Sequence, residues 1–243
     1  MTQSWIKFLD KIEFGIDAIK SDIICYRGQP QSNYDLIPSL LRKKNRNRQN
    51  SPTFEPDEAI LYFDFTTNAG SLLPHHYSDW DILFEMRHHG LPTRIMDWTE
   101  NFAVALYFAL QGNPKSPTIW MIDPFELNKF SFGNTIPNPI DLGFSYSDAY
   151  INDEKKPSEN PIVIIAPRKS TRLLAQKGVF ILQGSDRTPM NKNPKILSCF
   201  KKFELPLDAI GDAFHFLELA GVNHYSLFPD LDGLAKYLFE LHS

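Results

Sequence analysis

The chain has 243 residues, of which 42% are hydrophobic and 22% charged, so it is long enough and apolar enough for one large globular domain. Its 25 Lys and Arg against 29 Asp and Glu give a net charge of −4, which argues against a general binder of nucleic acid or anionic membranes. Two cysteines, Cys25 and Cys199, lie in apolar runs, and no signal peptide or membrane span is visible, so we expect a reduced, cytoplasmic protein.

The first predicted elements are a helix over residues 4–20, with Ser4 as its N-cap, and a short buried strand over residues 23–26. The strand is expected to end at Arg27, Gly28, Gln29 and Pro30. An arginine followed by glycine places a cation beside backbone that a ligand can approach closely. A turn with a solvated arginine is the simpler explanation of these four residues taken alone.

A basic run at residues 42–48 has polar neighbours and no interleaved aromatic residues, which favours a surface loop over a nucleic-acid site. Helices are predicted over residues 56–70 and 79–86. The neighbouring pairs His75-His76 and His88-His89 do not predict a metal site, because adjacent side chains point to different sides of a regular element. We therefore expect no bound metal.

The densest group of polar residues lies between residues 88 and 99 and combines two histidines, two threonines, Arg94, Asp97 and Trp98. An abrupt turn at Gly90 and Pro92 precedes it, and an apolar helix is predicted over 102–110. Asp97 or Thr99 is expected to cap that helix, and a helix N-terminus beside an arginine is a natural anion site. Capping explains each residue alone, but the density of Arg, His, Asp and Trp together favours a functional site.

The second half of the chain predicts strands over 118–122, 162–166 and 178–182, the last paired with 196–205, and a helix over 206–220. A last helix, capped by Asp230, is expected to bury Leu234, Leu238 and Leu241. Residues 131–160 lack periodicity and predict a long irregular excursion, with a lid as one interpretation. Because strands and helices mix without a regular βαβ order, we predict a single α+β domain over residues 1–243.

These motifs resemble the FRG domain family. Tyr26-Arg27-Gly28-Gln29 with Pro38-Ser39-Leu40 is similar to the family's opening motif, and residues 88–99 with 105–109 are similar to its central motif. Arg172, Gln176, Gly178 and Phe180 resemble its third motif, and residues 228–234 its C-terminal one. Arg87 departs from the pattern, because the family more often has Gln before the histidine.

The chain has, in order, an aromatic-Arg-Gly strand end at residues 26–28, a Thr motif that opens an Ala- and Phe-rich helix, and a late strand with a polar pair. This order is similar, more distantly, to that of NAD-dependent ADP-ribosyltransferases. It implies a central mixed or antiparallel, split sheet flanked by helices, with NAD as the substrate. The catalytic residues that it implies are Arg27, His89, Asp97 and Gln176. The NAD-binding residues that it implies are Arg27, Gly28, Gln29, His88, Thr93, Arg94, Trp98, Thr99 and Phe180.

Transferases of this kind carry a glutamate on the late strand, where this sequence has Gln176, Lys177 and Gly178. A neutral amide lacks the charge of a carboxylate, and losing such a group typically costs about 2.7–4 kcal/mol of barrier. Asp97 is the nearest substitute. A functional site of either kind, catalytic or purely binding, requires Arg27 and the Asp97-Trp98-Thr99 segment to face one shared hollow.

Two functions stay open. One is an NAD-consuming enzyme, either an ADP-ribosyltransferase or an NAD glycohydrolase, whose acceptor is unidentified. The other is a non-catalytic sensor that binds a nucleotide or a peptide in the same pocket. A toxin, an antiviral-defence effector and a housekeeping enzyme remain alternatives for the intracellular role, and nucleic acid and membranes are not expected partners.

Overall fold

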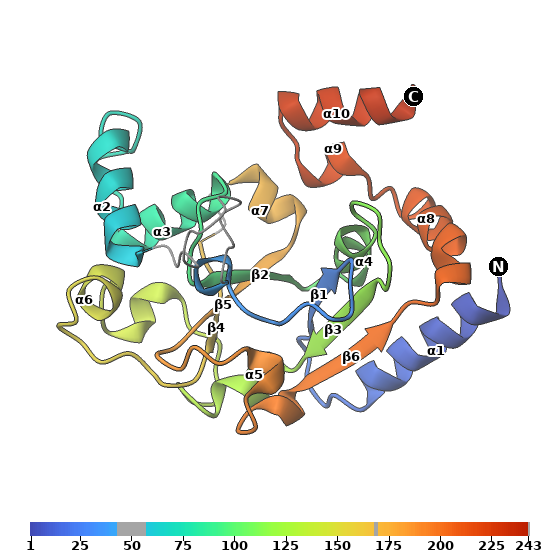
Figure 1. The fold of residues 1–243 in the computed structure, drawn as a ribbon, viewed down its shortest axis with the longest axis horizontal. Coiled ribbons are helices and arrows are strands. Elements are labelled where there is room, and N and C mark those ends of the chain that lie inside the picture. Colours follow the sequence, from blue (N-terminus) through green and yellow to red (C-terminus); the bar gives the residue numbers. More distant parts are fainter. Residues whose placement is uncertain (43–56, 168–169, 243) are drawn as a thin grey trace, which may run out of the picture.

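The computed structural model describes residues 1–42, 57–167 and 170–242 (Figure 1). Most of the basic run predicted at 42–48 therefore lies outside the described residues. Within the described ranges, no helix combines the length and the apolar character needed to cross a membrane.

A six-stranded sheet in the order β4-β5-β2-β1-β3-β6 forms the centre of the described structure, and every neighbouring pair is antiparallel. Its strands are β1 (Cys25–Gln29), β2 (Ile95–Thr99), β3 (Thr118–Ile122), β4 (Ile162–Ile164), β5 (Gly178–Leu182) and β6 (Phe200–Glu204). β1 and β2 share the single register pair Tyr26↔Thr99, whereas β2 and β5 are paired along all of β2. The sheet is therefore nearly split at its middle, and the α+β prediction is confirmed.

The helices lie around this sheet in Figure 1. They are α1 (Gln3–Asp17), α2 (Glu58–Ala69), α3 (Asp79–His88), α4 (Phe102–Ala109), α5 (Pro124–Asn128), α6 (Tyr146–Tyr150), α7 (Thr171–Ala175), α8 (Ile210–Leu219), α9 (His224–Leu227) and α10 (Leu231–Leu241). The predicted helices over 79–86 and 102–110 are confirmed as α3 and α4.

The closest helix-to-sheet contact is that of α4 on β1, and Gly28 makes it possible. A Cβ atom on Gly28 would collide with the carbonyl oxygen of Ala105 and lie 2.6 Å from the amide nitrogen of Ala109. The alanine-rich face of α4 is buried with Tyr26 and Met121 in one apolar cluster, to which α1 and α8 also contribute. Glycine on the strand and alanine on the helix thus set the spacing of this layer.

Two further clusters complete the core. On the opposite face of the sheet, Cys25, Trp98, Trp120 and Ile181 pack together with side chains from the irregular segments that follow β1 and β5. The third cluster joins α3 and α6 to β4 and β5, with Leu83, Tyr146 and Phe180 among its members. Tyr146 is 1% exposed, so part of the 131–160 excursion is packed into the core rather than lying over it.

The N-terminal boundaries differ from the prediction. Thr2, not Ser4, is the N-cap of α1, because its hydroxyl accepts from the amide of Trp5, while Ser4 donates to Asp208. β1 runs from Cys25 to Gln29, so Arg27 lies inside a strand and not at its end.

The central motif also differs. Asp97 and Thr99 do not cap α4, since both belong to β2; the cap is Asn101, whose side chain accepts from the amide of Ala103. The apolar side chains of β2 are buried on both faces of the sheet, Ile95 on one face and Met96 and Trp98 on the other. Backbone pairing with β5 and this burial outweigh the local capping pattern.

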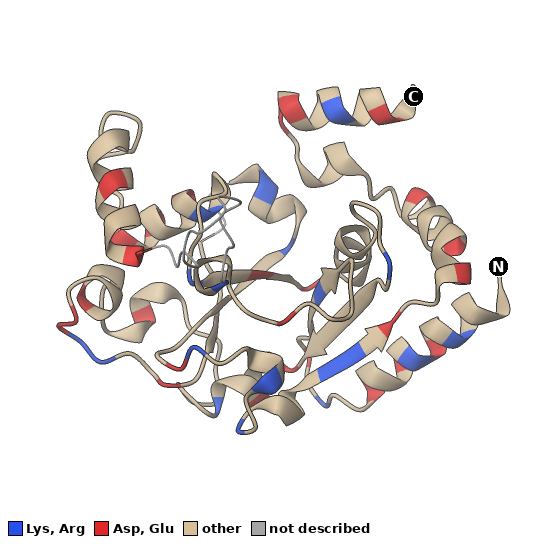
Figure 2. Ribbon diagram, in the orientation of Figure 1, with Lys and Arg blue, Asp and Glu red and all other residues tan. Residues whose placement is uncertain are grey.

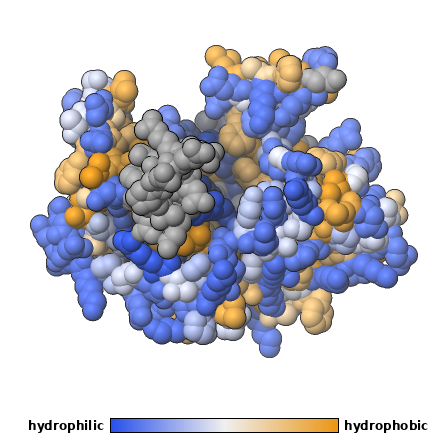
Figure 3. Space-filling model, in the orientation of Figure 1, coloured by the Kyte–Doolittle hydropathy of each residue, from blue (hydrophilic) through white to orange (hydrophobic). Residues whose placement is uncertain are grey.

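The C-terminal half contains two further corrections. Residues 200–204 pair with β3 and not with 178–182, because β5 lies between β2 and β4. Asp230 caps α10 as predicted, but Leu238 and Leu241 are 44% and 59% exposed instead of buried. Figure 3 shows hydrophobic residues on the surface over α10, which packs mainly on α9.

Candidate functional site

The candidate site lies where β1 and β2 part. Beyond the Tyr26↔Thr99 pair no further register pair joins the two strands, and the Arg27 side chain bridges the gap by donating from Nη1 to the backbone oxygen of Asp97. Arg27 Nε is buried and has no hydrogen-bond partner in the described part of the chain. A buried N–H without a partner is costly, so this donor is suited to an acceptor atom of a ligand.

A central cavity of about 260 Å³ opens at this gap. Tyr26, Val104, Ala105 and Phe108 form its apolar wall, and Arg27, Arg87, Asp97, Arg172 and Gln176 form its polar wall. The structure thus brings Arg27 and the Asp97-Trp98-Thr99 segment to one hollow, as the sequence predicts.

Asp97 is the carboxylate of the central cavity, and the Arg87 guanidinium donates to both of its oxygens. Arg87 Nε lies 3.0 Å from Oδ2 and 3.2 Å from Oδ1 of Asp97, and Nη2 also donates to Oδ2. Partial burial would by itself raise the pKa of Asp97, but the charge and hydrogen bonds of Arg87, together with the charges of Arg27 and Arg172, hold that pKa below its ordinary value. Asp97 is therefore ionised at neutral pH.

Guanidinium groups outnumber this carboxylate. Burial, followed by repulsion from Arg42 and Arg87, lowers the pKa of Arg27 to about 10 despite the opposing attraction of Asp97. Burial and the charge of Arg87 also lower the pKa of Arg172. In Figure 2 basic positions on β1, α7 and the end of α3 surround the middle of the sheet, whereas basic and acidic positions mix elsewhere. The central cavity consequently presents net positive charge.

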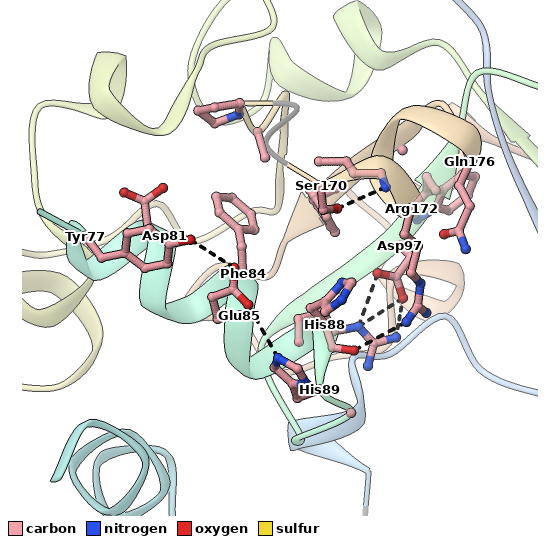
Figure 4. Close-up of a pocket in the computed structure, with 18 residues that line it drawn as sticks. Tyr77, Asp81, Phe84, Glu85, His88, His89, Asp97, Ser170, Arg172 and Gln176 are labelled. Carbon is pink, nitrogen blue, oxygen red and sulfur yellow. Dashed lines mark hydrogen bonds and ion pairs between the residues drawn. The ribbon is translucent and has the colours of Figure 1, made fainter. Parts of the chain in front are cut away.

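A second cavity of about 450 Å³ adjoins the first and is called here the histidine cavity (Figure 4). It shares Arg87, Asp97, Arg172 and Gln176 with the central cavity. Its other lining side chains include aromatic and titratable groups from the end of α3 and from β5: Phe84, Glu85, His88, His89 and Phe180. The two hollows are thus one site with Asp97 between them.

The two neighbouring histidines have different surroundings. His88 lines the histidine cavity near Arg172 (Figure 4), and burial together with the charge of Arg172 lowers its pKa. His89 turns towards the rim, where its Nε2 lies 3.6 Å from Glu85 Oε2 and its side chain is 64% exposed. His88, predicted to bind NAD, is therefore the histidine next to Arg172, whereas His89, predicted to be catalytic, pairs with Glu85 at the rim.

The polar residues after β2 are tied to neighbouring elements by hydrogen bonds. Thr99 Oγ1 donates to the backbone oxygen of Gln176 at 2.7 Å, and Gln176 Nε2 donates to the backbone oxygen of Leu227 at 3.0 Å. Arg172 Nη1 donates to the backbone oxygen of His88 at 3.3 Å. Thr99 and Gln176 thus fix α7 between β2 and α9, so that Arg172 faces the cavity.

Three predicted NAD-binding residues lie away from both cavities. Gln29 is buried, and its Oε1 accepts from Trp120 Nε1 at 2.8 Å. Arg94 forms a buried ion pair with Glu58, with side chains 9% and 13% exposed, and its guanidinium lies 3.9 Å from the Tyr150 ring centroid. Thr93 is buried, and its amide donates to Ser39 Oγ. All three residues hold the fold together.

The remaining predicted residues border the site in different ways. Gly28 lines the central cavity through its contact with α4, and Phe180 lines the histidine cavity with its ring 5.0 Å from that of Phe84. The Trp98 side chain belongs to the core on the far face of the sheet, and its Nε1 has no partner in the described part of the chain. Trp98 is therefore a wall of the site and not an exposed stacking surface.

The prediction missed Arg87 and Arg172 as site residues. In the sequence Arg87 stands out only as a departure from the family motif, and a spacing of ten residues between Arg87 and Asp97 carries no local signal of contact. Among the described residues, no group of three or more His, Cys, Asp or Glu side chains could hold a metal ion.

Comparison with known proteins gives one result. No curated protein and no solved structure matches the chain. The family model of the FRG domain matches residues 22–117, a span that contains Arg27, Arg87 and Asp97 but ends before Arg172 and Gln176. Residues 22–117 thus carry the FRG domain, as the opening and central motifs of the sequence predict.

Proposed function

We propose that the two adjoining cavities bind NAD and that the protein cleaves its nicotinamide–ribose bond. The observation that carries this proposal is the excess of guanidinium groups around one ionised carboxylate: Arg27, Arg87 and Arg172 around Asp97. Guanidinium groups bind phosphate oxygens with two parallel hydrogen bonds, and a positively charged hollow concentrates anionic ligands. A diphosphate is the anionic part of NAD.

The shape of the site agrees with a dinucleotide. Cavities of about 260 and 450 Å³ together fall in the size range of small-molecule and cofactor sites. In the proposed arrangement the diphosphate lies between Arg87 and Arg172, at the boundary of the two cavities. The apolar wall of Val104 and Phe108 is then available to one ring of the dinucleotide, and Phe84 and Phe180 to the other.

The proposed reaction breaks the bond between ribose C1′ and the nicotinamide nitrogen. The bonding electron pair leaves with nicotinamide, and the ribose becomes an oxocarbenium-like cation that an ionised Asp97 stabilises. Water or an acceptor hydroxyl then bonds to C1′, and its proton passes to His88, whose lowered pKa leaves it neutral and able to act as a base.

A second candidate is binding without turnover, in a nucleotide or peptide sensor. Arg87 occupies both oxygens of Asp97, which offsets the negative charge that the reaction needs. The Gln176 amide, which takes the place of the usual glutamate, already donates to Leu227. Both observations favour a pocket that binds an anion and leaves it intact.

The test is incubation of the protein with NAD labelled in the nicotinamide ring, beside calorimetric titration with ADP-ribose. We expect nicotinamide release that is lost in Arg27→Gln and in Arg172→Gln. Arg187→Gln is the matched control, because Arg187 lines a different hollow beside Tyr34 and Pro189. Thermal unfolding of each variant separates loss of the site from loss of the fold.

The possible outcomes distinguish the enzyme from the non-catalytic sensor. Turnover that both site variants lose and the control keeps supports the enzyme. Saturable ADP-ribose binding with no nicotinamide release supports the sensor. Absence of binding and of turnover in the unaltered protein at millimolar ligand rejects both.

The same proposal extends to a cytoplasmic role as an NAD-depleting toxin or antiviral-defence effector. Expression of the protein in cells should then lower their NAD content, and the Arg27→Gln variant should not. Unchanged NAD at equal expression would rule out this biological role.

A further inference from the structure

The guanidinium of Arg172 faces the cavity from a helix of five residues, α7. Its Nη1 bond to the backbone oxygen of His88, at 3.3 Å, leaves most of its donors for other partners. A long arginine side chain loses about 2 kcal/mol of rotamer entropy when it is held in one position. Some further contact is needed to hold this group where a ligand would meet it.

The ring of Phe228 provides that contact. The Arg172 guanidinium carbon lies 4.5 Å from the centroid of this ring, within the range of a cation–π interaction. The Arg172 guanidinium thus lies between the His88 backbone, on the far end of α3, and the aromatic face of Phe228, just after α9.

Phe228 is itself fixed by its neighbours. Its ring stacks on His224 with centroids 4.5 Å apart and planes at 20°, and it meets Phe108, a wall of the central cavity, edge-on at 6.3 Å. His224 Nδ1 lies 2.7 Å from the hydroxyl of Tyr107 on α4. Burial raises the pKa of Tyr107 to about 12, so its hydroxyl keeps its proton in this contact at neutral pH. The backbone oxygen of Leu227, next to Phe228, accepts from Gln176.

We propose that Phe228 is a positioning residue that holds the Arg172 guanidinium against the cavity, and that α9 thereby completes the anion-binding wall. The consequence for ligand binding rests on the proposed function above. The completed site then depends on a segment that lies more than a hundred residues beyond the matched FRG region. An isolated fragment of residues 22–117 would lack both Arg172 and the ring that orients it.

The test compares Phe228→Leu, which keeps apolar volume but removes the aromatic face, with Phe228→Tyr, which keeps the face. Phe14→Leu on α1 is the matched control, since Phe14 is 76% exposed and lies on another part of the fold. Two readouts are used: the affinity for ADP-ribose and for inorganic pyrophosphate by calorimetry, and the Nε–H resonance of Arg172 by NMR.

We expect Phe228→Leu to weaken both ligands about three- to tenfold, in line with the strength of a partly exposed cation–π contact. The Arg172 resonance should lose its aromatic ring-current shift in Phe228→Leu and keep it in Phe228→Tyr and Phe14→Leu. Equal affinities for Phe228→Leu and the unaltered protein, or an unchanged Arg172 resonance, would overturn the inference. If the unaltered protein binds neither ligand, the proposed function fails, and the Arg172 resonance still decides whether Phe228 positions this arginine.

Discussion

Asp97 sets the charge balance of the central cavity, because its carboxylate faces the guanidinium groups of Arg87, Arg27 and Arg172. Arg87 binds it most directly, and the other two arginines act on it through their charge. The same carboxylate that keeps three cations together also weakens their attraction for a phosphate. Binding and catalysis therefore make opposite demands on this residue.

Asp97→Asn should separate these demands. The substitution removes one negative charge at nearly constant shape, so we expect ADP-ribose to bind more tightly and any NAD cleavage to be lost. The Asp97 side chain is 45% exposed, which limits the expected loss of folding stability to about 1 kcal/mol. Calorimetry at two salt concentrations measures the change, with Asp64→Asn on α2 as the control. Weaker anion binding in Asp97→Asn would contradict the proposed role of the arginines.

At the scale of the elements, the contact of α4 with β1 determines where the site can open. The helix approaches the strand at Gly28, and Val104, Ala105 and Phe108 then form the apolar wall of the central cavity. The position of the wall thus depends on the absence of a side chain one residue after Arg27.

Gly28→Ala should move this wall and destabilise the protein. The new Cβ would overlap the backbone of α4, which cannot yield as a flexible side chain can, so we expect a loss of about 1–3 kcal/mol or more. Gly211→Ala on α8 is the matched control, because its Cβ would meet no atom within 4 Å and should stabilise the helix by up to about 1 kcal/mol. Denaturant unfolding of both variants checks the difference. Equal midpoints would show that α4 can shift without cost.

Two histidines, His88 at the end of α3 and His224 on α9, should make stability depend on pH. Burial is the first cause that lowers the pKa of each imidazole below 6.5. The second cause is the charge of Arg172 for His88 and of Lys236 for His224, against the opposing charges of Glu85, Asp230 and Glu240. The unfolded chain then binds more protons than the folded one in this range. The free energy of unfolding should accordingly fall as the pH drops from about 6.5 towards the two lowered pKa values.

His224→Gln should reduce this slope, since glutamine does not titrate. His215→Gln on α8, whose side chain is 59% exposed, is the control and should keep it. Urea unfolding between pH 5 and pH 7 measures the slope in each variant. A slope that His224→Gln leaves unchanged would show that the Tyr107–His224 contact does not resist protonation.

At the scale of the whole molecule, one sheet joins three apolar clusters. The four tryptophans of the chain are distributed among them: Trp5 under α4, Trp98 and Trp120 on the opposite face, and Trp80 between α3 and α6. Strands β1 and β3 contribute side chains to the first and second clusters, and β2 and β5 contribute to the second and third. Loosening one cluster should therefore loosen the others.

Leu106→Ala and Leu83→Ala should therefore shift one common unfolding transition. Both leucines are fully buried, in the clusters of α4 and of α3, and each truncation should cost about 2–5 kcal/mol. Tryptophan fluorescence and far-ultraviolet circular dichroism should give the same midpoint in each variant. Two separated transitions would show that the single domain predicted from the sequence consists of two folding units.

Local sequence determined the elements that carry their own signal. The apolar run of α4, the compact strands β3 and β5, and the Asp230 cap of α10 follow from residues that are neighbours in the chain. The motifs around Arg27 and Asp97 also predict the FRG domain. They predict a shared hollow as well, because the two motifs form the neighbouring central strands β1 and β2.

Only the tertiary structure decided which polar side chains face that hollow. The identity of Arg94 does not distinguish its buried pairing with Glu58 from a ligand contact. Strand alternation places Gln29 on the same face of β1 as Arg27, and its side-chain oxygen accepts from Trp120 there instead of reaching the cavity. Arg87 and Arg172 reached Asp97 through helix packing over long separations. Hydrophobic patterns and caps act over a few residues, whereas the direction of a charged side chain depends on strand register and on which helix lies opposite, and those are settled only when the whole sheet forms.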